Sequence, residues 1–357
     1  MDTKKIVSAF AFSSRVTSID ECKIGHINST FFVNCEDGRY VVQKINKGIF
    51  KNPAEIMANV TGVTDHIRAK LAAVGGDTKN GTLQFVKSGD RYYHIDEEGE
   101  YWRAYRFVDG NCYQTCDTTE LFCRVGAAFG EFQNQLADYD AATLFEVIPN
   151  FHHTAKRYEA FETAAMADVC RRAKDCAEEI AFIRARKTAC AFIVDGLATG
   201  KFPLRVTHND TKLNNVIMNK ETGEGLCVID LDTVMPGSLL YDFGDAIRFG
   251  ASSAAEDETD LDRVYVKTEM FEAFTKGFVT SLKKSITKEE LLALPEAARV
   301  ITLEQAIRFL TDHLQGDTYF RIHHEGHNLE RARNQLKLVA DLEAKMPTLQ
   351  AIVNQYL

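Results

Sequence analysis

A dense group of hydrogen-bonding side chains occupies residues 206–219, with the sequence VTHNDTKLNNVIMN. The side chains of this segment that could bind a ligand or act in catalysis all lie within positions 208–215: His208, Asn209, Asp210, Lys212, Asn214 and Asn215. The apolar run at 216–218 follows directly and predicts a short strand. Polar residues just before a strand are typical either of a surface turn or of a catalytic loop. The spacing of the side chains, together with the strand, turn and carboxylate that follow, favours the catalytic loop.

Four residues separate Asp210 from Asn215. The catalytic loops of protein kinases have the same interval, in which Asp accepts the proton of the acceptor hydroxyl and Asn holds Mg²⁺. One short loop can direct both side chains toward the transferred phosphoryl group, which explains the spacing. His208 is placed to brace such a loop, and Lys212 can reach phosphate oxygens or steady the carboxylate of Asp210. We predict that Asp210 is the base and Asn215 a metal ligand.

A second carboxylate follows the predicted loop. The strand 216–218 leads through a glycine-containing turn into LCVIDLD (226–232), which ends in Asp230 and Asp232. Carboxylate and amide oxygens suit Mg²⁺, so we predict Asp230 as the second metal ligand. The literal DFG at 242–244 follows a Pro-Gly-Ser turn instead of an apolar strand. Asp242 and Asp245 are therefore expected to cap a helix or tie the loop, and Asp232 is expected to be structural.

Contacts to phosphate are expected from the first third of the chain. The segment IGHINSTFFV (24–33) predicts a turn between two strands, with one glycine and therefore no glycine-rich phosphate loop. Backbone N–H groups around Asn28, Ser29 and Thr30 can still bind phosphate. An ordinary hairpin explains the same segment equally well.

The predicted elements change character along the chain. Residues 1–108 favour strands, with a hairpin at 31–45, one helix at 52–76 and three strands within 81–108. From about 117 the pattern becomes helical, with one helix at 118–137, one or two within 157–198 and further helices over 257–355. We predict an α+β, protein-kinase-like fold of two lobes. Residues 1–108 would form a small β-rich nucleotide-binding lobe and 109–357 a larger, mostly helical lobe with the catalytic and sugar-binding groups.

Charge and composition exclude several partners. The formal net charge of −9 argues against binding to nucleic acid or to an anionic membrane surface. No apolar run approaches membrane-spanning length. The nine cysteines are odd in number and contain no CxxC pair, which favours reduced thiols and a cytoplasmic protein. We expect a monomer or a weak dimer.

The central motifs resemble a known family. The segments LRVTHNDTKLNN (204–215) and IDLDTVMPGSLLYDFGDAIRFGAS (229–252) are similar to the aminoglycoside phosphotransferase and choline kinase superfamily. Further segments, GHINSTF, NPAEIMANV, FGEFQN and RFLTDHLQGDTYF, extend the resemblance over nearly the whole chain. Within the superfamily, the chain resembles the N-acetylhexosamine 1-kinases.

This resemblance implies an activity and a set of site residues. The activity is ATP- and Mg²⁺-dependent phosphorylation of the anomeric hydroxyl of GlcNAc or GalNAc. The resemblance again places Asp210 as the base and Asn215 and Asp230 at the metal. It implies that the sugar pocket is formed by His26, Asp210, Asp230, Phe249, Arg308 and Tyr319. The adenine site is expected at the junction of the lobes, formed by Arg106, Phe107, Val108 and Asp109.

The sequence departs from the superfamily at one position. The third strand usually presents a Lys or Arg to the ATP phosphates, whereas YVVQKI places Gln43 there and turns Lys44 to the other face. We count Gln43 and Lys212 among the nucleotide-binding candidates but predict no phosphate-binding lysine. Two alternatives stay open. One is a kinase for another sugar, choline or an aminoglycoside. Arg308 argues against choline and aminoglycosides, because these two acceptors are cationic. The other is a catalytically weak nucleotide-binding protein, which only Gln43 favours.

Overall fold

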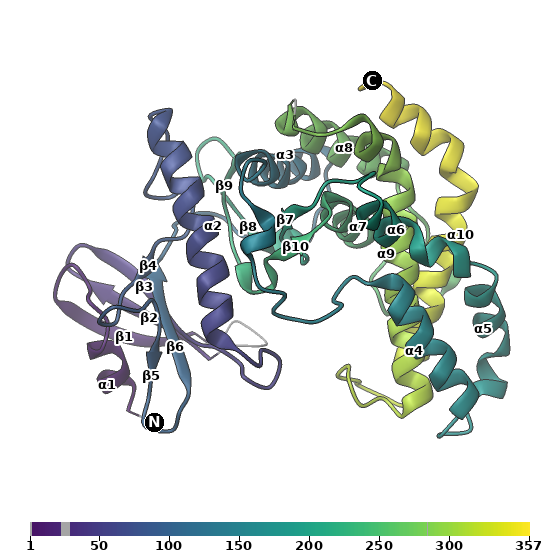
Figure 1. The fold of residues 1–357 in the computed structure, drawn as a ribbon, viewed down its shortest axis with the longest axis horizontal. Coiled ribbons are helices and arrows are strands. Elements are labelled where there is room, and N and C mark those ends of the chain that lie inside the picture. Colours follow the sequence, from purple (N-terminus) through teal and green to yellow (C-terminus); the bar gives the residue numbers. More distant parts are fainter. Residues whose placement is uncertain (1, 23–28, 284) are drawn as a thin grey trace.

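The computed structural model describes residues 2–22, 29–283 and 285–357. Figure 1 shows a small sheet-containing part at one end of the molecule and a larger helical part at the other. The last long strand of the sheet ends at Arg106, and the first helix of the larger part begins at Thr119. The predicted α+β fold with a small β-rich lobe and a larger helical lobe is confirmed. We propose that the lobe boundary lies between residues 108 and 109.

The first lobe is built on an antiparallel sheet with the strand order β1-β2-β3-β6-β4, and β5 also pairs with β6. The predicted hairpin at 31–45 and the three predicted strands within 81–108 are confirmed. The strands are β1 (Val16–Cys22), β2 (Thr30–Cys35), β3 (Gly38–Lys44), β4 (Phe85–Val86), β5 (His94–Ile95) and β6 (Tyr101–Arg106). In the register, Gln43 of β3 is paired with Thr30 of β2 on one side and with Arg103 of β6 on the other.

The two faces of this sheet have different roles because side chains alternate along each strand. On the outer face, Val33, Val42 and Trp102 pack with α1 (Thr3–Ser8) in one apolar cluster. On the inner face, α2 (Pro53–Ala73) lies between the sheet and the helical lobe (Figure 1). The apolar cluster around α2 includes side chains of the helical lobe, so α2 joins the two lobes.

The helical lobe surrounds two short hairpin-like sheets that support the predicted catalytic loop. Strand β7 (Arg205–Thr207) pairs with β10 (Met235–Gly237), and β8 (Val216–Met218) pairs with β9 (Gly225–Val228). The helices are α3 (Thr119–Gln135), α4 (Thr154–Ala167), α5 (Ala177–Arg184), α6 (Phe192–Ala198), α7 (Leu239–Gly250), α8 (Thr268–Leu282), α9 (Lys288–Gln315) and α10 (His327–Asn354). Residues 157–198 thus contain more helices than predicted, because α4 ends at Asp168 in the left-handed conformation.

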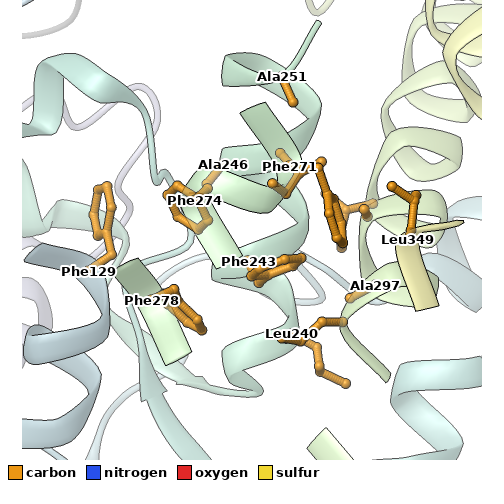
Figure 2. Close-up of a cluster of buried hydrophobic side chains, with 14 of the residues drawn as sticks. Phe129, Leu240, Phe243, Ala246, Ala251, Phe271, Phe274, Phe278, Ala297 and Leu349 are labelled. Carbon is orange, nitrogen blue, oxygen red and sulfur yellow. The ribbon is translucent and has the colours of Figure 1, made fainter. Parts of the chain in front are cut away.

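The core of the helical lobe lies where α7 meets α3, α8 and α9. Figure 2 shows Phe243 of α7 among Phe271, Phe274 and Phe278 of α8. Helix α3 approaches α8 closely at Gly130. A Cβ atom at this position would lie only 2.3 Å from the carbonyl oxygen of Phe278, so there is no room for a larger residue. This rigid core holds α7 directly behind the predicted catalytic loop. Among the described residues, no helix is both long and apolar enough to cross a membrane.

Candidate active site

The predicted catalytic loop runs from the end of β7 to the 3₁₀ turn Leu213–Asn215, and it brings Asp210, Lys212 and Asn215 together. The Nζ atom of Lys212 lies 2.7 Å from Oδ1 of Asp210. Asn215 donates from Nδ2 to Oδ2 of Asp210 at 3.1 Å and to the Asp210 carbonyl at 2.7 Å. The Asp210 side chain remains partly exposed, at 28%. Its carboxylate is therefore oriented by two neighbours and still accessible to a substrate.

His208 connects this loop to the segment with Asp230. The ring is completely buried, and its Nδ1 accepts the backbone N–H of Asp210 at 3.2 Å. Its Nε2 lies 2.9 Å from the carbonyl oxygen of Ile229. Both contacts are satisfied by a neutral imidazole with the proton on Nε2, because a carbonyl can only accept a hydrogen bond. Ile229 also donates its N–H to the carbonyl of Asn215 at 2.9 Å. The residue before Asp230 is thus fixed to the catalytic loop at two points.

Asp242 lies behind the loop and ties it in place. Its carboxylate is 1% exposed and accepts the backbone N–H groups of His208 at 3.0 Å and Asn209 at 2.8 Å. Gln133 donates a third hydrogen bond at 2.6 Å. Burial raises the pKa of Asp242, which these donors oppose. Asn209 has the left-handed φ of 66°, so its backbone benefits from this restraint. The expectation that Asp242 ties the loop is confirmed, and Ser238 instead caps α7.

Asp245, one turn further along α7, holds the other side of the loop. Its carboxylate accepts the N–H of Thr211 at 3.1 Å and pairs with Arg248 at 3.0 Å. Burial disfavours the charged form of Asp245, but Arg248 and Lys212 outweigh burial and lower its pKa. Burial likewise opposes the charge on Lys212, whose pKa is raised by Asp210 and Asp245. This alternation of charges favours the ionised forms of Lys212 and Asp245.

We expect Asp242→Ala to destabilise the fold without changing the metal requirement. Each buried donor that loses its acceptor costs about 1–3 kcal/mol, and this variant leaves two backbone amides and one side-chain amide without it. The free energy of unfolding, measured by urea denaturation, should fall by roughly 3 kcal/mol or more. Asp195→Ala, at an exposed helical position, is the control and should change little. A change in Mg²⁺ dependence with unaltered stability would contradict this role.

Asp230 follows β9 at the point where the chain changes direction. Strand β9 ends at Val228, two residues earlier than predicted, and Asp230 adopts the left-handed φ of 59° before the 3₁₀ turn Leu231–Thr233. Asp230 is exposed to solvent. Desolvation by the protein atoms around its carboxylate, together with Asp232 and Asp210, raises the pKa of Asp230 to about 6. A carboxylate held near two others is suited to a cation.

The donor atoms fit a magnesium ion. Asn215 donates through its amide nitrogen, so its amide oxygen is the atom that can bind a metal, and Asp230 supplies a carboxylate. Within 2–22, 29–283 and 285–357, no group of three or more His, Cys, Asp and Glu side chains is placed to bind a metal ion. Mg²⁺ commonly takes only one or two carboxylates from the protein and completes its shell with water and substrate phosphates. The residues present therefore fit Mg²⁺ delivered with a nucleotide.

We expect the affinity for Mg²⁺ to fall at acidic pH. Because a metal ligand must be deprotonated, Mg²⁺ competes with the proton on Asp230, whose pKa is about 6. The half-saturating Mg²⁺ concentration for ADP binding should stay level above about pH 7 and rise toward tenfold per unit below about pH 6. Calorimetric titrations over this range would measure it, corrected for proton binding by ADP itself. An Asp230→Asn variant should lose this pH dependence, and its persistence would exclude Asp230.

The expected nucleotide-binding residues occupy different places. Ser29 and Thr30 lie at the start of β2, where Ser29 accepts the N–H of Lys44 and Thr30 contacts Gln43. Val108 is buried at the junction of the lobes. Phe107 packs edge-on against Phe32. Asn28, like the sugar-pocket candidate His26, lies outside the described residues.

Two of these candidates have side chains that point away from the inner face of the sheet. Arg106 lies over the ring of Tyr40 and donates to the Asp37 carbonyl at 3.3 Å, on the outer face. Asp109 pairs at the surface with Lys220 at 2.6 Å. Alternation along β6 explains Arg106, because Trp102 and Ala104 on the same face belong to the outer cluster. Only backbone groups of these two residues could therefore contact a nucleotide between the lobes.

The expected sugar-binding residues are brought together only in part. Arg308 of α9 lies 5.9 Å from the ring of Tyr319 and 5.7 Å from that of Phe151, and its Nη1 donates to Oε1 of Gln305 at 3.0 Å. Tyr319 is 69% exposed. Phe249, 41% exposed, lies at the end of α7, on a different element. Arg157 of α4 lies near this site, because its Nη2 donates to the carbonyl of Phe151 at 3.1 Å. Burial and the nearby Arg308 lower its pKa.

A buried chain of contacts joins this region to the catalytic loop, and the sequence did not indicate it. Glu304, one turn before Arg308 on α9, accepts from Thr154 at 2.5 Å and lies 2.8 Å from Nδ1 of His152. Nε2 of His152 is 3.4 Å from the carbonyl of Asn209. The acidic residue in the apolar run of α9 was the available signal, since a completely buried Glu needs partners.

A second overlooked residue is Arg103 of β6, whose side chain is 5% exposed. It pairs with Asp232, the residue that was expected to be structural, and its Nη2 lies 3.1 Å from Oδ2 of Asp232. The available signal was register. Antiparallel pairing places Arg103 beside Gln43, which occupies the position where the superfamily usually has a phosphate-binding lysine or arginine. Lys44 points elsewhere and lies 3.6 Å from Glu100.

A kinase-like fold with an Asp–Asn loop facing a second carboxylate defines the class of phosphotransferases. A model of the phosphotransferase enzyme family (APH) matches residues 18–268, more than half of the chain, and the protein belongs to this family.

Solved structures share this fold at low sequence identity. An aminoglycoside phosphotransferase from Alicyclobacillus acidocaldarius is 12% identical, with a TM-score of 0.59, covering 99% of this chain and 96% of that one. A spectinomycin phosphotransferase in complex with ADP and spectinomycin is 13% identical, with a TM-score of 0.51 and 98% coverage of both chains. A choline kinase from Cryptosporidium parvum is 12% identical, with a TM-score of 0.52, covering 94% of this chain and 91% of that one.

Proposed function

We propose that this protein is an ATP- and Mg²⁺-dependent kinase that phosphorylates the 1-hydroxyl of N-acetylhexosamines, GlcNAc or GalNAc. The observation that supports a kinase most directly is the pairing of the partly exposed Asp210 carboxylate with Lys212 and Asn215, beside the loop of Asp230. The ADP complex of the spectinomycin phosphotransferase favours an adenine nucleotide as the phosphoryl donor. The substrate class rests on the sequence resemblance and on the group around Arg308.

In this proposal, Asp210 positions the anomeric hydroxyl and accepts its proton as the hydroxyl oxygen bonds to the γ-phosphorus of ATP and the bond from that phosphorus to ADP breaks, releasing ADP. An anomeric hydroxyl is more acidic than an ordinary alcohol, so Asp210 needs to act only as a weak base. Lys212, held 2.7 Å from Asp210, keeps the carboxylate directed and offers a positive charge to phosphate oxygens. When bound by Asp230 and Asn215, Mg²⁺ would neutralise charge on the phosphates. The remaining contribution is alignment of acceptor and donor by the loop.

Two other residues would select the acceptor. The guanidinium of Arg308 and the hydroxyl of Tyr319 can both donate hydrogen bonds to sugar hydroxyls or to the acetamido carbonyl. Arg157 adds a second positive charge near Arg308. Two guanidinium groups disfavour a cationic acceptor such as choline or an aminoglycoside, because like charges repel. A neutral, oxygen-rich acceptor satisfies the donors of this site.

A panel of acceptors tests the proposal. ADP release would be followed in a coupled assay with N-acetylhexosamines, unmodified hexoses, 2-deoxy sugars, choline and an aminoglycoside. We expect GlcNAc or GalNAc to react fastest. The 2-deoxy sugars should react far more slowly, because they lack the 2-acetamido group and leave the polar groups of the site without a hydrogen-bond partner. The product should be a non-reducing 1-phosphate, identified by ³¹P NMR. A reducing 6-phosphate would refute the regiochemistry, and faster reaction of choline would refute the substrate class. Nucleotide binding without turnover of any acceptor would favour a catalytically weak protein.

We expect Arg308→Ala to reduce kcat/KM for the N-acetylhexosamine. The loss of a hydrogen bond from a charged donor costs about 2–3 kcal/mol, which corresponds to roughly 30- to 150-fold. KM for ATP should remain within about threefold, because α9 lies in the helical lobe, away from the sheet. Arg321→Ala removes the same charge from an exposed neighbouring position and is the control. Equal effects of the two variants would exclude a direct contact of Arg308 with the sugar.

A further inference from the structure

A row of polar side chains crosses the inner part of the sheet and ends in the other lobe. The strand register aligns Thr30 of β2, Gln43 of β3 and Arg103 of β6. Gln43 donates from Nε2 to Oγ1 of Thr30 at 3.1 Å. Its Oε1 accepts from Arg103 at 3.1 Å from Nε and at 2.7 Å from Nη2. Gln43 therefore fixes the plane of the Arg103 guanidinium.

The row continues across the space between the lobes to Asp232. Both terminal nitrogens of Arg103 contact the Asp232 carboxylate, which makes this a bidentate pair. Each of the two side chains is only 5% exposed. Asp232 belongs to the 3₁₀ turn Leu231–Thr233, which begins directly after Asp230. A planar, bidentate ion pair restricts orientation more strongly than a single point contact does. The sheet of the first lobe is thereby fixed to the turn that positions Asp230.

The position of Arg103 shows which residue supplies a positive charge in place of the lysine that protein kinases have on the third strand. Here Gln43 occupies that position, and Lys44 points toward Glu100 at 3.6 Å. The positive charge instead comes from the next strand, where Arg103 is paired with Gln43 in the register. Because Arg103 contacts the neighbouring Asp232, it can act on Asp230 without touching the substrate.

We propose that Arg103 is a positioning residue for the metal-binding carboxylate Asp230, with Gln43 orienting its guanidinium and Asp232 transmitting the restraint. The inference rests on the proposed role of Asp230 in binding Mg²⁺, but not on the identity of the acceptor. Residues that orient metal ligands from outside commonly contribute 10- to 100-fold to metal affinity or activity. A pair that only stabilised the junction of the lobes would leave metal binding unchanged in a folded variant.

The test separates positioning from stability by changing both members of the pair. Removal of one partner leaves a buried charge uncompensated and is expected to unfold the protein, whereas replacing both by apolar residues is often neutral. The double variant Arg103→Met/Asp232→Leu is therefore the main variant, and Arg103→Lys keeps the charge without the bidentate geometry. Arg184→Met/Glu162→Leu removes a more exposed bidentate pair between α5 and α4, far from the lobe junction, and is the control.

The measured quantity is the factor by which Mg²⁺ tightens ADP binding, obtained by calorimetry with and without Mg²⁺, together with Tm. We expect the double variant to keep a Tm near that of the unmodified protein and to lose roughly 10-fold or more of this factor. Arg103→Lys should lose part of it, and the control none. KM for the acceptor should change by less than about threefold in each variant.

Each outcome decides a different claim. A folded double variant with an unchanged Mg²⁺ factor would overturn the positioning role of Arg103. If Arg103→Lys and the double variant both failed to fold, Gln43→Leu, which keeps the ion pair, must still lower the factor, and an unchanged value would overturn the proposal. If the unmodified protein bound ADP without any effect of Mg²⁺, the proposed metal site would fall together with this inference. A failed acceptor panel with a Mg²⁺ factor lost in the variants would overturn only the sugar assignment.

Discussion

Asp210→Asn should lower kcat by roughly 10²- to 10⁴-fold while leaving the fold and substrate binding intact. The substitution keeps the size and one oxygen of the side chain but removes the group that can accept a proton. Asn215 can still donate to the remaining oxygen, so the loop should hold its shape. Initial rates in the coupled ADP assay, with the best acceptor of the panel, would measure kcat. Affinities for ADP and acceptor should change only a few-fold.

The control for this prediction makes the same chemical change elsewhere. Asp90→Asn replaces an exposed aspartate of the first lobe and should retain full activity. Lys212 provides an internal check, because it is paired with Asp210 and would lose that partner in the variant. If Asp210→Asn turned over at nearly the unmodified rate, Asp210 could not be the base. Loss of ADP binding in the variant would instead indicate a role for Asp210 in the nucleotide site.

Asp230→Ala should reduce activity by roughly 10²- to 10³-fold or more at ordinary Mg²⁺ concentrations. Asp230 is exposed to solvent, whereas the neighbouring Asp232 is buried and paired with Arg103. Removing it leaves Asn215 as the only other predicted protein ligand for Mg²⁺. The Mg²⁺ dependence of the initial rate and of ADP binding would measure the effect. Asn215→Ala should raise the half-saturating Mg²⁺ concentration by about 10-fold or more.

Asp242→Ala is the informative comparison for Asp230→Ala, because both remove an aspartate that resembles the metal-binding residue of a DFG motif. Asp242 is buried behind the loop, and both of its carboxylate oxygens accept hydrogen bonds from the loop backbone. Loss of Asp242 should lower stability. Loss of Asp230 should leave stability equal or slightly higher at neutral pH, because the raised pKa of Asp230 means that the folded state disfavours its charged form. If Asp230→Ala lowered Tm and kept its Mg²⁺ dependence, the assignments of these two aspartates would have to be exchanged.

The sequence alone determined the features that depend on neighbouring residues. Alternating and helical periodicities predicted the hairpin, the strands, α2 and α3, because side chains on one face must meet the core at a fixed repeat. The interval between Asp210 and Asn215 predicted a loop that brings these side chains together, and the structure shows them within hydrogen-bonding distance. Their catalytic roles remain predictions. The choice of Asp230 over Asp242 could also be argued locally, from the apolar strand before one and the turn before the other.

Only the tertiary structure decided contacts between distant segments. Arg103 and Asp232 are 129 residues apart, and His152 and Glu304 are 152 apart, so no local pattern shows that they meet. The face on which a strand residue lies depends on which strands pair and in which register, and for this reason Arg106 turned outward while Arg103 turned inward. A buried charge is tolerated only where the folded chain supplies its partner, and this partner is defined by the packing of the lobes.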